Sequence, residues 1–494
     1  MTEGAGQAQA STLVRRVAGT LLLVLGAVML LRWGQLLSAY LDDLVLFVNE
    51  NTLRDYEVYG RFRRGLLPLQ GPITSIGGNH GWLAAWIYGA AVMLVPEAET
   101  PMLVSLGAVV VGWIVGIALA WRHAPGVPTL LAALLIPATH LPLLLCFPSH
   151  ISFILVGVSL TFLGVSRARE HAGWAVVATL GVAVAIGAHR TGWGVLAALI
   201  VIDWRLGLGI LRRPVAWIPL GLYLVPELLV LSFGGAPTEV TDGRAAEYVT
   251  LIAPWNVLRA IPFASPPTSE LEPLQVVQLV LVLAVLALAR RGLHTPVTRA
   301  LWWFYVVGAL VLLCFPEDEQ YYIPLLAVLP ALLAVATQVV AARGTAALAA
   351  WCAAVLAVFG ASHAEATVDL REQFGEEEGI RSILPELAVV EALERHGITR
   401  PELWNRTIHT LVNPARGVSY LVVLLVELDH EAPPTPRCFR IDRQTNVEGQ
   451  AGWEAVGPTW ALKVTEEDPC PGTVARYDSP IWYLDLRTWS FVAR

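Results

Sequence analysis

Two adjacent carboxylates, Asp42 and Asp43, are the residues best placed by type and spacing to do chemistry. Residues 38–41 before them and 44–48 after them are mostly apolar. Carboxylates this close together can bind a cation, or one of them can have its pKa raised and become a general base. The alternative is a pair at a helix end that simply faces water. A divalent cation at this pair is the one cofactor that the sequence suggests.

Four arginines that follow the acidic pair along the chain could bind an anion. Arg61, Arg63 and Arg64 follow the acidic pair, and Arg190 lies beside His189 between two apolar segments. Guanidinium groups bind phosphate well because their donors match its oxygens in a fixed geometry. In each case the alternative is anchoring of the chain to lipid headgroups.

The elements that must position these residues are membrane helices. Of the 494 residues, 55% are hydrophobic and only 15% are charged, whereas soluble proteins carry about 25% charged residues. Long uncharged stretches predict spanning helices, and a helical bundle satisfies the backbone inside lipid. The bilayer is therefore a partner. No polybasic tail is present, so nucleic acid is not expected to be one. Arginine replaces lysine everywhere except at Lys463, which together with the Ala, Leu, Val and Gly content indicates a bacterial source.

The arginines predict the topology, because cytoplasmic loops are enriched in basic residues. The inside markers are Arg15, Arg16, Arg122, Arg167, Arg169, Arg205, Arg212, Arg213, Arg290, Arg291 and Arg343. Between them we expect about eleven spans, at 17–37, 101–121, 127–147, 150–166, 173–188, 192–204, 214–234, 273–289, 298–315, 322–342 and 345–361. Segment 80–95 then becomes a juxtamembrane or re-entrant helix. The alternative is one more span, with one arginine cluster on the external side.

The sequence therefore predicts an all-α polytopic bundle over 1–361, with external loops 38–100 and 235–272, followed by a small α/β extracytoplasmic domain over 362–494. In this domain we expect a helix at 382–396 and strands at 418–428 and 481–486. Its two cysteines, Cys438 and Cys470, can form a disulfide outside the cytoplasm; the alternative is two free thiols.

The order of span, acidic pair, long external loop, bundle and external domain resembles the GT-C glycosyltransferases, in particular the protein-mannosyltransferase and aminoarabinose-transferase type. An acidic pair after the first span is typical of that family, and Asp42-Asp43 matches it. Segment 79–83 stands where the family has His-Pro-Pro-Leu, with His80 kept and both prolines missing. Segment 187–192 matches a Gly-rich motif with Arg190 in place of lysine.

Two further segments carry the resemblance with departures. Segment 320–324, with Tyr321 and Tyr322, matches a motif at the start of a late span. At 147–150, His150 stands where many members have a second acidic residue. The resemblance makes His80, His150, Tyr321 and Tyr322 candidate pocket residues.

The resemblance implies transfer of a sugar from a polyprenyl-phosphate donor to an extracytoplasmic lipid, glycan or protein acceptor. Asp42 or Asp43 would be catalytic, and Arg190 with Arg61, Arg63 and Arg64 would bind the donor phosphate. The enzyme would lie in the bacterial plasma membrane with its N-terminus in the cytoplasm. Two alternatives remain: a polysaccharide ligase or polymerase, and a non-catalytic scaffold or transporter whose external domain binds a partner.

Overall fold

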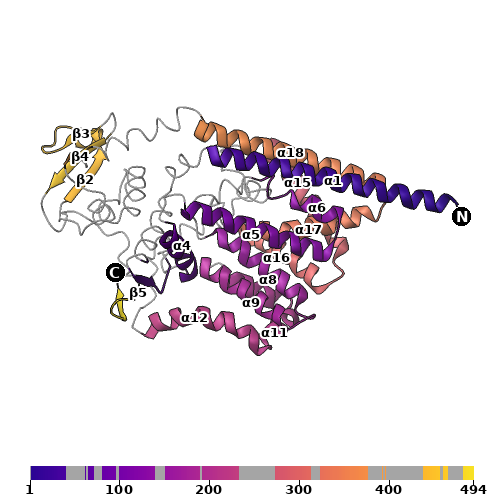
Figure 1. Cartoon of the computed structure of the whole chain (residues 1–494), viewed down its shortest axis with the longest axis horizontal. Coiled ribbons are helices and arrows are strands. Elements are labelled where there is room, and N and C mark those ends of the chain that lie inside the picture. The colour runs from indigo at the N-terminus through magenta and orange to yellow at the C-terminus, as the bar shows by residue number, and fades with distance from the viewer. Residues whose placement is uncertain are drawn as a thin grey trace.

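The computed structural model of the chain is a helical bundle with small β-sheets at one end (Figure 1). The residues that it describes are 2–39, 62, 65–71, 81–95, 100–139, 151–189, 192–232, 273–312, 323–375, 392, 395–396, 438–456, 460–465 and 482–493.

The bundle is built around α17 (Ile323–Ala341), most of whose side chains are buried. Two long helices, α1 (Thr2–Ala39) and α18 (Thr345–Gly375), lie side by side at its edge (Figure 1). In the membrane-length part of each of these helices only 17% of the residues are buried, as expected of helices that largely face lipid rather than other helices. The other helices are α4 (Trp82–Leu94), α5 (Thr100–His123), α6 (Val127–Ala133), α8 (Ser152–Arg167), α9 (Gly173–Ala188), α10 (Trp193–Ile202), α11 (Trp204–Leu211), α12 (Trp217–Ser232), α15 (Pro273–Ala289) and α16 (Pro296–Leu312).

Glycines allow α8 and α9 to pack with their backbones in contact. A Cβ atom on Gly157 would lie 2.6 Å from the backbone nitrogen of Ala185, and one on Gly181 would lie 2.6 Å from the carbonyl oxygen of Gly157. Small residues at such interfaces are common in membrane bundles, where close packing replaces the hydrophobic effect between helices. This pair therefore packs closely beside α17.

Among the described residues, five helices are long and apolar enough to cross a membrane: Arg16–Ala39, Thr100–His123, Pro273–Gly292, Ile323–Ala341 and Thr345–Val368. The helices Trp204–Leu211 and Pro214–Val230 pass the same test only when taken together, and they are bent by 90° at the break between them, as in a broken span or a re-entrant loop. The chain is a multi-pass membrane protein by these features. Within the predicted segment 80–95, residues Trp82–Leu94 are helical, as α4.

Segment 127–147 was expected to be one continuous helix, and this is wrong. The helix α6 ends at Ala133 and turns follow as far as Thr139. Pro137 explains the break, because proline disfavours helical geometry in the residue before it and has no backbone N–H. Its carbonyl accepts hydrogen bonds from the Trp33 indole at 2.8 Å and the His363 Nδ1–H at 2.9 Å.

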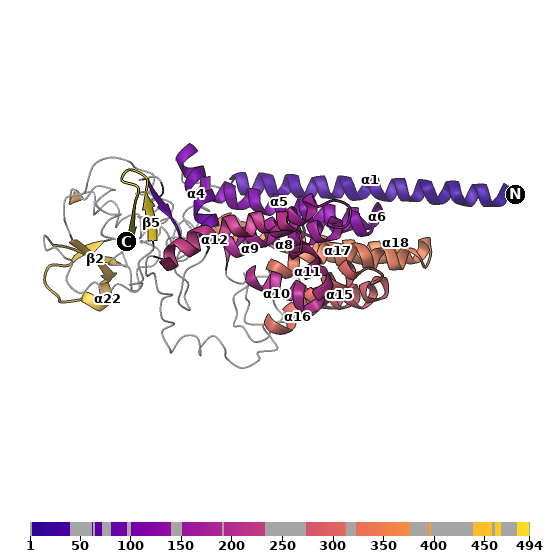
Figure 2. The same ribbon diagram turned by 90° about the horizontal axis from the view of Figure 1, so that it is seen from below.

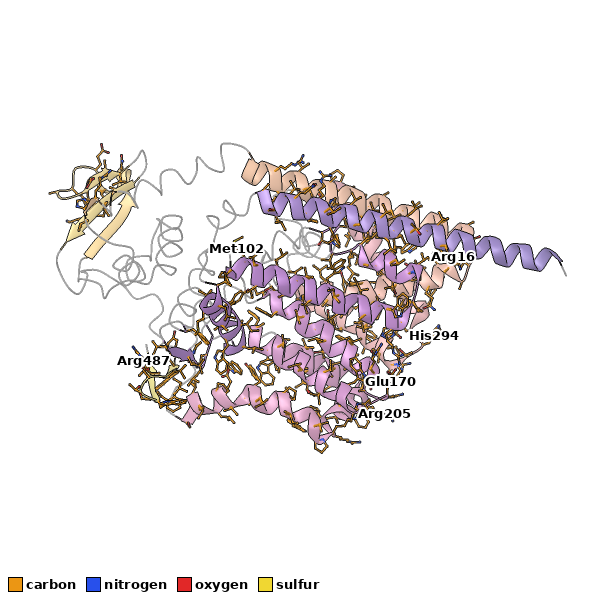
Figure 3. All side chains as sticks on the ribbon, in the orientation of Figure 1. Arg16, Met102, Glu170, Arg205, His294 and Arg487 are labelled. Carbon is orange, nitrogen blue, oxygen red and sulfur yellow. The ribbon has the colours of Figure 1, made fainter. Side chains whose placement is uncertain are left out.

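One end of the bundle carries the basic residues that the topology assigns to the inside. Arg122, at the end of α5, forms an ion pair with Glu170 in the turn after α8. Figure 3 shows Arg16, Glu170, Arg205 and His294 at this end, whereas Met102 and Arg487 lie at the other. The helix ends and turns that carry these labelled residues therefore lie on the same side of the bundle.

A three-stranded antiparallel sheet, in the order β2-β4-β3, belongs to the C-terminal region. Its strands are β2 (Cys438–Arg443), β3 (Glu454–Val456) and β4 (Trp460–Thr465), and the short helix α22 (Gln444–Val447) follows β2. His396 Nε2 contacts the Glu454 carboxylate at 2.6 Å, and this contact lowers the pKa of Glu454. The expected strand 418–428 and most of the expected helix 382–396 lie outside the described residues.

A second antiparallel sheet joins distant parts of the chain. Its order is β1-β5-β6, with β1 (Leu66–Pro68), β5 (Trp482–Asp485) and β6 (Ser490–Ala493). The expected strand at 481–486 is confirmed as β5, but it pairs with β1 of loop 38–100 and not with the sheet of its own region. Helix α18 also continues to Gly375, beyond the expected boundary at 361.

Candidate functional site

The candidate site lies at the end of the bundle nearest the strands, where α4 meets α9 (Figures 1 and 2). Gly81, just before α4, packs directly on the last turn of α9. A Cβ atom on Gly81 would lie 2.5 Å from the Gly187 Cα atom and 2.6 Å from the Ile186 carbonyl oxygen. Only glycine fits, so this contact fixes the start of α4 against the end of α9.

Helix α9 ends at Ala188, and the following residue, His189, has an extended backbone and a side chain that is only 9% exposed. The N–H of Gly192, just before α10, donates to the His189 carbonyl at 2.8 Å. A Cβ atom on Gly192 would overlap the backbone of Ala185. The described residues on either side of Arg190, His189 and Gly192, are therefore held close to the last turns of α9.

Aromatic and acidic side chains from α4 and α12 extend this site. Trp82 stacks on Tyr223 with ring centroids 5.9 Å apart, and its indole N–H donates to the Tyr223 carbonyl at 3.0 Å. The Tyr223 hydroxyl donates to the half-buried Glu227 carboxylate at 3.3 Å. Tyr223 also lies against Gly187. The arrangement places a carboxylate and an aromatic cluster beside the end of α9.

A buried cluster of hydroxyl groups joins α4 to α5 and α8. The Tyr88 hydroxyl, on a fully buried side chain, hydrogen-bonds Ser105 and lies 3.4 Å from the Ser152 oxygen. Buried hydroxyls need such partners because an unpaired polar group is costly in an apolar interior. The cluster fixes the first turn of α8, which follows Ile151, relative to α4.

Almost all of the site residues expected from sequence lie outside the described residues. They are Asp42, Asp43, Arg61, Arg63, Arg64, His80, His150, Arg190, Tyr321, Tyr322 and Cys470. Their described chain neighbours are informative in two cases. Gly81 directly follows His80 and contacts the helix that ends two residues before Arg190. Gly81 and the end of α9, which are more than a hundred positions apart in sequence, thus lie in contact.

The expected cation site and disulfide stay predictions. Among the described residues no group of three or more His, Cys, Asp or Glu side chains could hold a metal ion, and the Asp42–Asp43 pair lies outside them. The backbone of Cys438 starts β2, opposite Thr465 of β4. Its expected partner, Cys470, lies outside the described residues.

Sequence reasoning missed Glu227 and Tyr223. A signal for Glu227 was present, because it is the one acidic residue within the apolar segment 214–234. An ionisable residue in such a segment is costly and usually has a functional reason. Tyr223 lies one helical turn earlier on the same face, so the pair could have been found together.

No protein-family model matches the sequence, and no curated protein sequence matches it either. Solved structures do match. ArnT from Cupriavidus metallidurans bound to undecaprenyl phosphate aligns with a TM-score of 0.61 and 14% identity over 90% of this chain and 97% of ArnT. Its apo state aligns with a TM-score of 0.58 and 14% identity over 93% and 99%.

An oligosaccharyltransferase from Archaeoglobus fulgidus aligns with a TM-score of 0.41 and 12% identity, over 65% of this chain and 51% of its own; this similarity is too low to support an argument. The match to ArnT extends over nearly the full length of both chains, including the bundle and the C-terminal region. At 14% identity it is a similarity of fold. The chain therefore shares the fold of ArnT.

Proposed function

We propose that this protein is a GT-C-type glycosyltransferase that transfers a sugar from a polyprenyl-phosphate donor to an extracytoplasmic acceptor. The observation that carries the proposal is the alignment over 90% of this chain with ArnT in a structure bound to undecaprenyl phosphate. The acidic pair Asp42-Asp43 and the arginines support it, because the reaction needs a base and a phosphate-binding cation.

The proposed topology has eleven spans, with α4 as a juxtamembrane helix and the N-terminus in the cytoplasm of a bacterial cell. The distribution of charge supports it. Arg16 and Arg205 lie at one end of the bundle, while the candidate site and the strands lie at the other (Figure 3). Basic residues favour the cytoplasmic side, so the site would face outward, where lipid-linked sugars are used.

In the proposed reaction Asp42 or Asp43 removes the proton of an acceptor hydroxyl, whose oxygen attacks the anomeric carbon of the sugar. The bond from that carbon to the phosphate oxygen breaks, and polyprenyl phosphate leaves with the electron pair. Arg190, with Arg61, Arg63 and Arg64, would bind the phosphate and stabilise its charge. His80, His150, Tyr321 and Tyr322 would line the pocket, and Asp42 and Asp43 would also be the ligands of any divalent cation.

The first test is binding of undecaprenyl phosphate to the purified protein in detergent, by native mass spectrometry. We expect the wild type to bind, and Arg190→Ala to bind about tenfold or more weakly, because a hydrogen-bonded charge is lost. Arg212→Ala is the matched control, since Arg212 is exposed in the turn after α11, at the end of the bundle away from the site. Absence of binding by the wild type would refute the proposal.

The second test separates binding from chemistry. Asp42→Asn and Asp43→Asn, each alone, should keep the binding of undecaprenyl phosphate. At least one of them should lower glycan transfer in membranes by about 10²–10⁴-fold, the usual contribution of a general base. Full transfer by both variants would show that neither carboxylate is the base.

A further inference from the structure

Strands β5 and β6 form a C-terminal hairpin that is hydrogen-bonded to β1, near the middle of loop 38–100. In the register, Leu66, Leu67 and Pro68 of β1 lie opposite Asp485, Leu484 and Tyr483 of β5. The Leu69 N–H donates to the Trp482 carbonyl at 2.8 Å, and the Leu486 N–H donates to the Gly65 carbonyl at 2.8 Å. The hairpin thus holds both ends of the β1 segment.

The alternation of the ladder identifies the bonds that join the two parts. The hydrogen bonds between residues 65 and 486 and between residues 69 and 482 make Leu67 and Leu484 the hydrogen-bonded pair between them. Pro68, which has no N–H, is at a position that needs none, on an edge strand where proline is tolerated. Strand β5 is the central strand, so its other edge pairs with β6, where Tyr483 is opposite Val492.

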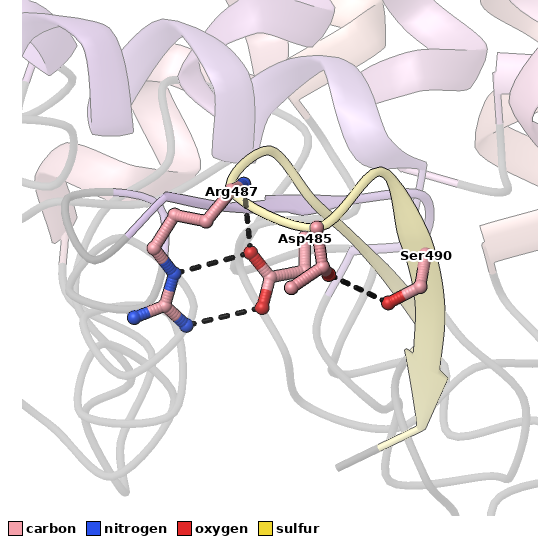
Figure 4. A network of polar contacts seen from close by, with 4 residues as sticks. Asp485, Arg487 and Ser490 are labelled. Atoms are coloured by element: carbon pink, nitrogen blue, oxygen red, sulfur yellow. Dashed lines mark hydrogen bonds and ion pairs between the residues drawn. The ribbon is translucent and has the colours of Figure 1, made fainter.

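The turn of the hairpin is braced by its own ion pair (Figure 4). The Arg487 guanidinium donates to both Asp485 oxygens, at 3.1 and 3.0 Å, and its backbone N–H donates to the same carboxylate at 2.9 Å. These contacts hold the pKa of Asp485 below its usual value. Tyr483, on the same strand, is fully buried. The hairpin therefore has a turn held by side-chain hydrogen bonds and a fully buried side chain on its central strand.

The β1 segment is attached in turn to α4. The Trp86 indole N–H donates to the Pro68 carbonyl at 2.7 Å. A Cβ atom on Gly89 would lie 2.6 Å from the Phe62 ring, so Phe62 packs directly on the helix. The start of α4 contacts α9 through Gly81 and Gly187. A continuous series of contacts therefore runs from the C-terminus to the helix end next to Arg190.

We propose that the β5–β6 hairpin is a positioning element: by pairing with β1 it holds α4 and the segment from Phe62 onward in the geometry that donor binding requires. This inference rests on the proposed function, because the donor is a polyprenyl phosphate. The hairpin acts through α4 and touches no reacting atom. Segment 482–493 is thus a functional part of the membrane site, although 362–494 was expected to be a separate external domain.

The pairing itself is tested without any ligand, in a background that lacks the five native cysteines. Leu67→Cys with Leu484→Cys should form a disulfide in oxidised membranes, because Cα atoms of such a pair lie about 5.5 Å apart and disulfides span about 4.4–6.8 Å. Leu67→Cys with Phe491→Cys is the matched control, since Phe491 is on β6, one strand further away. Cross-linking of both pairs, or of neither, would overturn the assigned pairing.

The positioning role is tested by Leu484→Pro, which removes the N–H that pairs with Leu67, against Leu484→Ala, which keeps it. We expect Leu484→Pro to bind undecaprenyl phosphate at least about tenfold more weakly, equivalent to about 1.4 kcal/mol, and Leu484→Ala to bind within about threefold of wild type. Turnover should show a raised KM for the donor with a smaller change in kcat, which loss of folded protein would not produce.

The outcomes separate the two proposals. If the wild type binds undecaprenyl phosphate and Leu484→Pro binds equally well, the positioning role is wrong while the proposed function stands. If the wild type does not bind, the proposed function is wrong, and the positioning role falls with it even where the Leu67–Leu484 disulfide forms. Donor binding at the wild-type level by the oxidised Leu67→Cys, Leu484→Cys protein, with weaker binding after the disulfide is reduced, would support the role directly.

Discussion

Single glycines decide how closely the parts of the candidate site approach one another. Gly81 has ordinary extended backbone angles, φ −68° and ψ 151°, so its importance is steric and not conformational. Any side chain there would meet the backbone of α9, which cannot move aside as a flexible side chain could. Segment 79–83 was singled out in the sequence, but the steric role of Gly81 within it appears only with the α9 contact.

We predict that Gly81→Ala separates α4 from α9. Overpacking of this kind costs about 1–3 kcal/mol, and the effect should appear as a lower melting temperature in detergent and weaker binding of undecaprenyl phosphate. Gly194→Ala is the matched control, because Gly194 is in the neighbouring α10 and nothing lies within 4 Å of its Cβ position. Equal effects of the two substitutions would contradict the close packing.

At the scale of elements, most helices could be predicted because their apolar segments end at arginines, glycines or prolines. Segment 173–188 coincides with α9, and segment 273–289 with α15. Segment 127–147 could not be predicted correctly, because hydropathy does not register the break at Pro137. Tertiary contacts stabilise that break. Trp33 of α1 and His363 of α18, which are far apart in sequence, both donate to the Pro137 carbonyl oxygen.

We predict that Trp33→Phe lowers the free energy of unfolding in detergent by about 1–2 kcal/mol. The substitution removes one hydrogen bond, worth about 1 kcal/mol, and leaves a small cavity at a side chain that is 3% exposed. Trp121→Phe is the control, since Trp121 is 53% exposed on α5. A loss of the same size at Trp121 would mean that the Pro137 contact contributes little.

At the scale of the whole molecule, the sequence could not show that the C-terminus returns to the first external loop. A run such as 481–486 indicates a strand but not its partner, and Gln70 and Trp482, which touch, are 412 positions apart. The candidate catalytic residues show the opposite case. Asp42, Asp43 and Arg190 were found from residue types and motif resemblance, and their roles remain predictions because they lie outside the described residues.

Orientation in the membrane is the prediction that concerns the whole molecule. The turn between α17 and α18, at the arginine-rich end, should face the cytoplasm, and the β5–β6 turn should face outward. In a cysteine-free background, an impermeant maleimide should label Thr488→Cys in cells with a permeabilised outer envelope and an intact plasma membrane. Thr345→Cys should react only after that membrane is opened. Both positions are exposed, so a lack of reaction reports sidedness and not burial.

The reverse pattern would place the acidic pair and the arginines on the cytoplasmic side, and the charge argument for an external transferase would be wrong. Labelling of both residues before the plasma membrane is opened would instead place them on the same side. The number of membrane crossings between Thr345 and Thr488 would then be even, and not the single crossing that the topology predicts. Labelling of Thr488→Cys alone also constrains the count, because α18 must then cross the membrane once and the hairpin must meet β1 on the external side. The sheet β1-β5-β6 requires this, since strands on opposite sides of a membrane cannot pair. The external position of loop 38–100 follows from the same experiment.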